Sequence, residues 1–331
     1  VLLGAASAGS TVPVHFDPHS ASMPLDNLNV MVTGSPGKGK TSLIKSFVCQ
    51  VRSRGINTLL IDFKNDFASD GEFMALAGLR GFTVGFDGLP FNPLIPYPVS
   101  HPRTGRQFIH CNQHIGHIAS LLDKAYSLGD QQEARLRNAM RDCYLAHGVD
   151  PNTQIEHNSG TAFPDLNEVG ARLAAVDPNA MNRLDPLFSL GIFRPEYVMS
   201  DFAGMLGSSI VIDLSTINDD RLKNALARIV IYSAHGYYNS QPHSRAIRQF
   251  MVIDEAHRVL GTEFVSNFVR ECRAYGVGMV LSSQFIHDFP QQVSGALSTK
   301  LIHGNDRDEG RVREISALLG LPVSNYDTVA G

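Results

Sequence analysis

The sequence of 331 residues predicts an α/β fold with a mostly parallel central sheet flanked by helices. Short apolar segments alternate with helical stretches, which is the pattern of parallel strands joined by crossover helices. A glycine-rich segment, GSPGKGKTS, connects the first strongly apolar segment to a helix. A long central stretch has helical periodicity, so we expect a mostly helical insertion within the α/β core.

The elements follow in chain order. The expected strands are residues 28–34, 57–62, 81–86, 208–214, 250–254, 276–283 and 299–304. A helix is expected to begin near Lys40. Between residues 105 and 150, isoleucine and leucine recur at a spacing of three to four, which predicts helices. We therefore expect a lead-in segment at 1–26, an α/β core formed by 27–100 and 205–331, and a helical insertion at 101–204.

The composition excludes some classes of protein. Apolar residues make up 43% and charged residues 18%, as in ordinary globular proteins, and the net charge of −4 gives no overall positive field for nucleic acid. No run reaches the roughly 18 apolar residues of a membrane span. The cysteines form no CxxC pair and no signal peptide is evident, so we expect a cytoplasmic protein. Because the chain begins with Val1, we interpret it as a piece of a longer protein.

The glycine-rich segment matches the phosphate-binding pattern G-x-x-x-x-G-K-[ST] between a strand and a helix. Its glycines let backbone N–H groups surround phosphate oxygens, and the lysine reaches the β and γ phosphates. Thr41 is expected to bind Mg²⁺ through its hydroxyl. The alternative is a glycine-rich turn without function. The residues expected to bind ATP are Gly34, Ser35, Pro36, Gly37, Lys38, Gly39, Lys40, Thr41 and Ser42.

The apolar segment FMVID ends on one acid, Asp254, and a second acid, Glu255, follows it directly. An acid at the end of a buried parallel strand points into the crevice where the phosphate loop also lies. We expect Asp254 to hold Mg²⁺ and Glu255 to activate the attacking water, which a hydrolase needs and a kinase does not. The alternative is that both acids simply begin a helix.

The segment GVGMVLSSQF ends on two hydroxyls and an amide. If this strand lies beside FMVID, Gln284 emerges beside Glu255. An amide donates to a γ-phosphate oxygen and accepts from water, so Gln284 is expected to sense the γ-phosphate. The alternative is a local cap made by Ser282, Ser283 and Gln284.

Together these segments resemble the HerA/FtsK superfamily of P-loop motor ATPases, which includes DNA translocases and the coupling and secretion ATPases of conjugation. The resemblance covers nearly the whole chain from about residue 24. The segments that carry it are GSPGKGKT, LLIDFKNDF, FNPL, SSIVIDLS, DEAH, VRECRAYGVGMVLSSQF and LIHGNDRDEGRVREISALLGL. The resemblance implies a RecA-like P-loop NTPase fold, ATP and Mg²⁺ as cofactors, and a homo-oligomeric, hexameric ring with ATP bound between subunits.

The resemblance also implies that one subunit of the ring supplies an arginine to the ATP bound by the neighbouring subunit. By motif position this is Arg273, with Arg270 three residues earlier on the same predicted helix face as the alternative. The sequence also departs from the family: Phe285-Ile286 follow the glutamine where many members have Arg-Pro. Asp62 and Lys64 occupy the segment where relatives often carry Asp-Pro with Gly-Glu, and we do not rank them with Lys40 or Glu255.

Three functions stay open. The first is a ring-forming ATPase motor that translocates along double-stranded DNA, of helicase type, working with a nuclease or other effector subunit in DNA processing, transfer or antiviral defence. The second is a secretion or conjugation ATPase that moves protein or nucleoprotein. The third is a nucleotide-dependent switch with little turnover, against which an intact Glu255 argues.

Other clusters have less specific meanings. His110, His114 and His117 fall on one helix face, which suggests a zinc site or, alternatively, a partly buried polar helix. Basic residues that could contact DNA phosphates or nucleotide, or simply lie on the surface, are Arg103, Arg106, Arg135, Arg137, Arg141, Arg307, Arg311 and Arg313.

Overall fold

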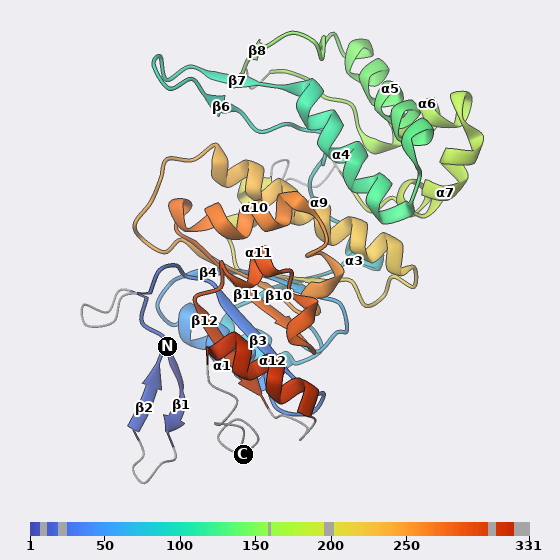
Figure 1. The fold of residues 1–331 in the computed structure, drawn as a ribbon. Helices are drawn as coiled ribbons and strands as arrows, with labels where there is room; N and C mark the ends of the chain where they lie inside the picture. The colour runs from blue at the N-terminus through green and yellow to red at the C-terminus, as the bar shows by residue number, and fades with distance from the viewer. Residues whose placement is uncertain (7–11, 19–24, 158–159, 195–201, 304–308, 321–331) are drawn as a thin grey trace. The chain divides into compact units, whose positions relative to one another are not determined.

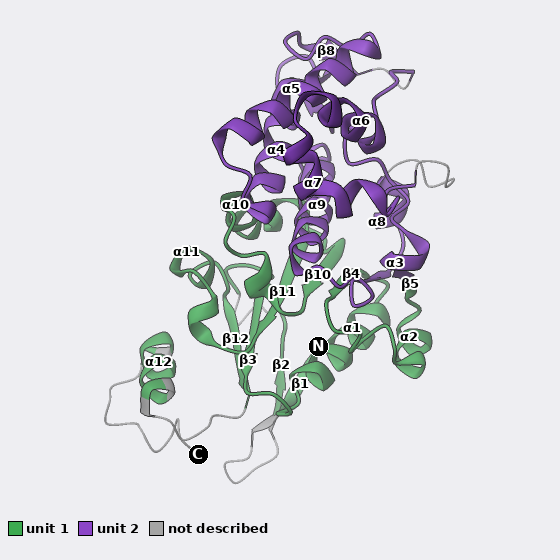
Figure 2. Ribbon diagram, turned by 90° about the vertical axis from the view of Figure 1, so that its right-hand side faces the viewer, with its two compact units in different colours: residues 1–80, 244–331 green, residues 81–243 purple. Residues whose placement is uncertain are grey.

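The computed structural model describes residues 1–6, 12–18, 25–157, 160–194, 202–303 and 309–320. Its contacts divide the chain into two compact units, residues 1–80 with 244–331 and residues 81–243 (Figure 2). The first unit is therefore discontinuous in sequence, and the second is inserted into it. The domain boundaries given above, 27–100 with 205–331 and 101–204, stay predictions.

The central sheet has seven strands in the order β12-β3-β11-β10-β4-β9-β5 (Figure 1). The pairs β12–β3, β3–β11, β11–β10 and β10–β4 are all parallel. This confirms the predicted fold class. In chain order the strands are β3 (Val30–Gly34), β4 (Asn57–Asp62), β5 (Arg80–Thr83), β9 (Ile210–Asp213), β10 (Gln249–Ile253), β11 (Val277–Ser283) and β12 (Thr299–His303).

The first unit surrounds its strands with helices and short turns. An antiparallel hairpin of β1 (Leu2–Ala6) and β2 (Val12–His15) precedes them. The helical elements are α1 (Lys40–Arg52), α2 (Gly71–Ala77), η1 (Ala256–Arg258), α10 (Glu263–Glu271), η2 (Cys272–Tyr275), η3 (Ile286–Asp288), α11 (Gln291–Ser294) and α12 (Glu309–Leu319).

Three aromatic rings anchor α1 to the sheet of this unit. Phe47 of α1 meets Phe250 of β10 edge to face at 5.1 Å between centroids, and Phe16 lies 5.6 Å from Phe47 and 6.2 Å from Phe250. All three side chains are buried. Each such burial contributes about 1.5–3 kcal/mol, and each edge-to-face pair adds about 0.5–1.5 kcal/mol. The helix that follows the phosphate loop is thereby held against the strand that precedes the two acids.

The second unit is mainly helical, as the periodicity between residues 105 and 150 predicted. It also contains a small antiparallel sheet of β6 (Val99–Ser100), β7 (Gln107–Ile109) and β8 (Ile155–Glu156). A capping box formed by Asp165 and Glu168 begins α6. The helices are α3 (Val84–Asp87), α4 (Cys111–Tyr126), α5 (Asp130–Ala146), α6 (Leu166–Val176), α7 (Pro178–Ser189), α8 (Phe202–Leu206) and α9 (Asp220–Asn239).

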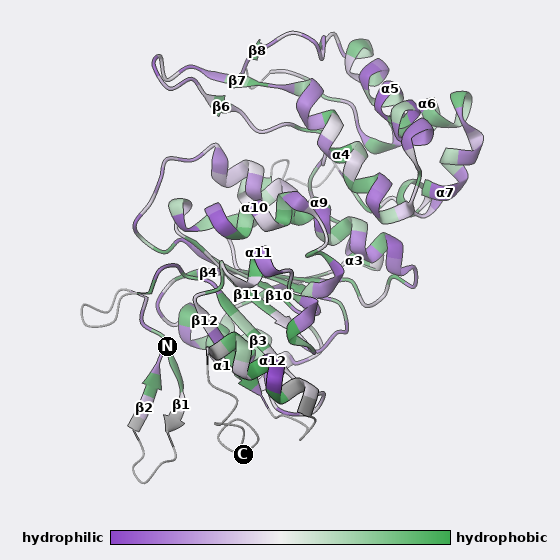
Figure 3. Ribbon diagram, viewed as in Figure 1, coloured by the Kyte–Doolittle hydropathy of each residue, from purple (hydrophilic) through white to green (hydrophobic). Residues whose placement is uncertain are grey.

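All seven expected strands are present, and Figure 3 shows that apolar residues concentrate in the central ones. One expectation was wrong in extent, because the strand expected at 81–86 ends at Thr83. The carboxylate of Asp87 accepts the N–H of Thr83 at 2.7 Å, and the intervening residues form the single turn α3. This side-chain contact four residues away favours a turn over continued strand.

Candidate functional site

The phosphate loop leaves β3 at Gly34 and enters α1 at Lys40. Gly34, Gly37 and Gly39 have φ values of 149°, 73° and 90°, which other residues rarely adopt. A Cβ at Gly34 would also lie 1.9 Å from the carbonyl oxygen of His303. The glycines of the motif are therefore needed for the bend itself, and Gly34 is needed for the pairing of β3 with β12.

The N-terminus of α1 is suited to an anion. The helix has no acidic residue in its first turn, and its N-cap residue, Gly39, makes no side-chain hydrogen bond to the backbone N–H groups of that turn. Lys40 donates to the carbonyl oxygens of Gly34 at 2.5 Å and Ser35 at 3.1 Å. Its ammonium thus lies over the loop, where a bound phosphate would meet it.

The two acids follow β10 as expected, and both are buried, with 6% and 7% of Asp254 and Glu255 exposed. Burial raises the pKa of Asp254 to about 6, and the nearby carboxylates of Glu255 and Asp62 act in the same direction. A divalent cation would offset this cost of ionisation. The carboxylate of Asp254 and the hydroxyl of Thr41 are oxygen donors of the kind that Mg²⁺ takes in proteins, so the residues fit that ion.

Glu255 has left-handed backbone angles, φ 50° and ψ 46°, which are uncommon outside glycine. Its Oε1 lies 2.5 Å from Nζ of Lys64, which follows β4. The two residues are 191 positions apart in sequence. The sequence analysis noted Lys64 without ranking it with Lys40 or Glu255, and its position two residues after the end of β4 was the available signal.

Asp62 explains how Lys64 is positioned. Its carboxylate accepts the N–H groups of Lys64, Asp66, Phe67 and Ala68 at 2.9–3.2 Å. Such a carboxylate fixes the loop after β4 and leaves little capacity for a ligand. We therefore read Asp62 as the residue that shapes the loop and Lys64 as the residue that the loop presents to Glu255.

Gln284 emerges between the phosphate loop and the acids, because β11 lies between β3 and β10. Ser283 is opposite Thr33 on β3, and Leu281 is opposite Ile253 on β10. Gln284 shares a cavity of about 20 Å³ with Gly34 and Thr33. The expected adjacency of β10 and β11 is confirmed, and the γ-phosphate contact of Gln284 stays a prediction.

The local cap that was the alternative for this segment exists but does not use the amide of Gln284. Oδ2 of Asp288 accepts the hydroxyl of Ser283 at 2.5 Å and the N–H of Phe285 at 3.0 Å. The turn is thus fixed on either side of Gln284.

Arg270 and Arg273 are both exposed, as a residue that acts on a neighbouring subunit must be. They do not lie on one α-helix as expected, because α10 ends at Glu271 and Arg273 belongs to the 3₁₀ turn η2. Arg270 donates to the side chain of Asn267. A role of either arginine at ATP stays a prediction.

The described side chains give no support for a zinc site on the histidine face. His110 precedes α4 as its N-cap residue, so only His114 and His117 lie on the helix. Nδ1 of His114 contacts the hydroxyl of Tyr232 at 3.0 Å and Nε2 contacts the carbonyl oxygen of Pro93 at 2.9 Å, so both ring nitrogens are engaged. Within the described ranges no three His, Cys, Asp or Glu side chains form a metal-binding group.

Four of the eight basic residues singled out above contact other described side chains. Arg106 pairs with Glu156, Arg135 with Asp177, and Arg137 with Glu133, whereas Arg141 donates to Asn112. Arg103 is exposed on the turn between β6 and β7. Arg313 is exposed on α12, while Arg307 and the side chain of Arg311 lie outside the described residues.

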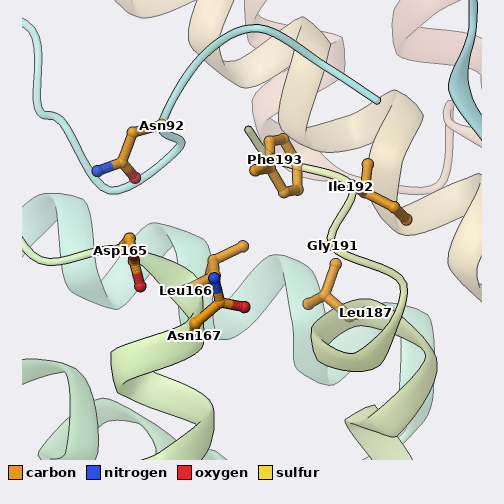
Figure 4. Close-up of a pocket in the computed structure, with 8 residues that line it drawn as sticks. All are labelled: Asn92, Asp165, Leu166, Asn167, Leu187, Gly191, Ile192 and Phe193. Carbon is orange, nitrogen blue, oxygen red and sulfur yellow. The ribbon is translucent and has the colours of Figure 1, made fainter. Parts of the chain in front are cut away.

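A further cavity in the second unit, of about 10 Å³, has room for about one water molecule (Figure 4). Asn92 lines it, but its amide donates to the carbonyl oxygen of Pro164 and accepts the N–H of Leu94. Asn92 of the FNPL segment thus fixes the local chain path. Among the helices that the structure describes, none has the length and apolar character to cross a membrane.

Comparisons with known proteins agree on the fold. Neither a protein-family model nor a curated protein matches the sequence. The structure of VirB4 from Thermoanaerobacter pseudethanolicus matches with a TM-score of 0.74 and 21% identity, over 100% of this chain and 90% of that one. The unbound bacterial conjugative coupling protein TrwBdeltaN70 matches with a TM-score of 0.54 and 17% identity, over 96% and 76%.

Another structure of the coupling protein TrwB contains a nucleotide. The plasmid coupling protein TrwB in complex with ADP and Mg²⁺ matches with a TM-score of 0.54 and 16% identity, over 96% of this chain and 78% of that one. The chain therefore has the fold that its resemblance implied.

Proposed function

We propose that the chain is an ATP-hydrolysing motor of the HerA/FtsK type. The observation that carries the proposal is the strand order β3-β11-β10. It brings the ends of three strands to one edge of the sheet, with the phosphate loop, Gln284 and the pair Asp254–Glu255 each following one strand. The structure of TrwB with ADP and Mg²⁺ supports the choice of nucleotide.

In this proposal the loop N–H groups and Lys40 bind the phosphates, while Thr41 and Asp254 hold Mg²⁺. The bound ion would neutralise charge on the phosphate oxygens. Glu255 accepts a proton from water as the water oxygen bonds to the γ-phosphorus. The bond from that phosphorus to the β,γ-bridging oxygen breaks, and the electron pair leaves with ADP. Gln284 contacts the γ-phosphate during this step.

We further propose a homo-oligomeric ring, hexameric by analogy with the family, that translocates along double-stranded DNA in the cytoplasm with an effector subunit such as a nuclease. Arg273, or Arg270, would contact the ATP of the neighbouring subunit. An arginine supplied in this way accelerates phosphoryl transfer by about 10³–10⁵ in related proteins. The exposure of both arginines supports this part of the proposal.

A second candidate is a conjugation or secretion ATPase that moves protein or nucleoprotein. Similarity to the conjugative coupling protein TrwB over 96% of this chain favours it. The nucleotide switch is less well supported. Glu255 is buried and follows β10, at the same sheet edge as the phosphate loop, and a switch gains nothing from a residue that activates water.

The deciding experiment is the steady-state ATPase rate with and without linear duplex DNA, at low and moderate salt, with Glu255→Gln as the blank. Strong stimulation that falls with salt supports a DNA motor, because phosphate contacts release counterions. An ATPase rate that is the same with and without duplex DNA favours the second candidate, the conjugation or secretion ATPase. Tight ATP binding without hydrolysis in the assembled state would favour the switch.

A further inference from the structure

The carboxylate of Glu255 is held from two sides. Its Oε1 lies 2.5 Å from Nζ of Lys64, and its Oε2 lies 3.6 Å from Nδ1 of His257, two residues later in η1. The second distance is too long for a hydrogen bond but short enough for electrostatic attraction. Because the side chain of Glu255 is only 9% exposed, these contacts decide where its oxygens point.

The hydrogen bonds around His257 assign the proton on its ring. Ser283 donates its one hydroxyl proton to Oδ2 of Asp288 at 2.5 Å. The oxygen of Ser283 is therefore left to accept from Nδ1 of His257, which lies 3.2 Å away. Nδ1 accordingly carries a proton, and this nitrogen lies 3.2 Å from Oγ of Ser283 and 3.6 Å from Oε2 of Glu255.

The contact between His257 and Ser283 connects His257 to the turn that contains Gln284. The same oxygen of Asp288 also accepts the N–H of Phe285 at 3.0 Å. Gln284 therefore lies between two residues that share one carboxylate, and one of them, Ser283, contacts His257. A shift of this turn therefore changes the distance from Ser283 to Nδ1–H of His257. The same N–H attracts the carboxylate of Glu255.

We infer that His257 is a positioning residue that couples the Gln284 turn to the orientation of the Glu255 carboxylate. This inference rests on the proposed function, in which Gln284 contacts the γ-phosphate and Glu255 activates water. When the turn moves towards a γ-phosphate, the N–H of His257 passes from Ser283 to Oε2 of Glu255. The carboxylate is then held by the imidazole N–H at Oε2, in addition to the contact with Lys64 at Oε1.

The first test compares substitutions at His257. His257→Ala removes the donor, and we expect kcat for ATP to fall about 10- to 100-fold, as for a misplaced catalytic group, with Kd for a fluorescent ATP analogue unchanged within about twofold. His257→Asn places an amide N–H near the position of Nδ1 and should restore most of kcat. His257→Gln carries the same amide one methylene farther out and should not.

A structural role alone would lower thermal stability and affect all three variants alike. The melting temperature is therefore recorded for each. Wild-type kcat in His257→Ala, or equal kcat in the Asn and Gln variants, would overturn the inference.

The second test is a double-mutant cycle with Ser283→Ala. If His257 acts through Ser283, the double variant loses no more kcat than the worse single variant. Additive losses would show that the two residues act independently and would overturn the coupling. Asp288 still accepts the N–H of Phe285 in Ser283→Ala, so the turn keeps that contact.

The wild-type protein and Glu255→Gln separate this inference from the proposed function. If the assembled wild type does not hydrolyse ATP, the proposed function fails and the coupling falls with it. If the wild type hydrolyses ATP, Glu255→Gln does not, and His257→Ala is normal, the proposed function stands and the coupling alone is wrong.

Discussion

Glu255 combines two costly features, a left-handed backbone and a buried carboxylate, and its Oε1 lies 2.5 Å from the ammonium of Lys64. Each is tolerated at functional sites when the surrounding structure enforces it. The side chain of Lys64 is 45% exposed, so solvent screens the pair and its contribution is smaller than that of a fully buried one.

We predict that Lys64→Met lowers the free energy of unfolding by about 1–2 kcal/mol, because it leaves the carboxylate of Glu255 without its cation. In a Glu255→Gln background, Lys64→Met should lower the free energy of unfolding by less, since a neutral amide needs no counter-charge. Denaturant unfolding of the four proteins in this cycle measures both effects. Equal costs in the two backgrounds would contradict a direct interaction.

His114 gives a prediction for pH dependence. Burial lowers the pKa of His114 to about 4, with the positive charge of His117 acting in the same direction, whereas the hydrogen bond to Pro93 opposes it. The unfolded chain therefore binds this proton more readily between pH 6.5 and 4. The resulting stability is fully present above pH 6.5 and is lost as the pH falls towards 4, up to about 3 kcal/mol.

This loss is measured as the difference in unfolding free energy between wild type and His114→Gln across that range. The difference should narrow as the pH falls. The same substitution at the exposed His15 controls for the removal of a histidine as such. A constant difference between pH 6.5 and 4 would show that His114 is not buried as a neutral ring.

At the scale of elements, β3 and its loop give the clearest prediction. Gly34→Ala places a Cβ 1.9 Å from the carbonyl oxygen of His303, so β12 must separate from β3. We expect a loss of at least about 2 kcal/mol in stability, together with loss of ATP binding.

Gly37→Ala is the matched control for Gly34→Ala. Gly37 also has a positive φ, 73°, but a Cβ there would meet no atom within 4 Å. Only backbone strain of about 1 kcal/mol is expected. Thermal unfolding and nucleotide binding of the two variants distinguish a steric clash from strain, and equal effects would contradict this account.

Local patterns predicted the elements well and the contacts between distant elements poorly. The strand ends at Gly34, Asp62 and Ser283 and the start of α1 at Lys40 follow from apolar runs and the glycine motif, which are local signals. The contact of Lys64 with Glu255 and the link from His257 to Ser283 depend on which strands become neighbours. The end of α10 before Arg273 was also missed, because no helix-breaking residue marks it.

At the scale of the whole molecule, the proposed ring predicts complementation between defective subunits. Arg273→Ala should bind ATP but hydrolyse it poorly, and Lys40→Ala should not bind it. Mixed oligomers should regain part of the ATPase rate, because a Lys40→Ala subunit supplies Arg273 to the ATP of an Arg273→Ala neighbour. The rate as a function of mixing ratio measures this effect.

Each variant alone is the control for this mixing experiment. The same mixture made with Arg270→Ala identifies which arginine acts at the neighbouring ATP. If no mixture exceeds the rates of its components, neither arginine acts between subunits.

The interrupted first unit has a consequence for biosynthesis. Of the pairs given above, β3 takes both of its partners, β11 and β12, from the last quarter of the sequence, and β4 pairs with β10. A growing chain therefore lacks the β10 partner of β4 until Gln249–Ile253 has left the ribosome, and lacks both partners of β3 until Val277–Ser283 follows. Late, long-range pairing of this kind slows folding and favours aggregation of nascent chains. The same order means that no active ATPase exists before β11 and β12 have been synthesised.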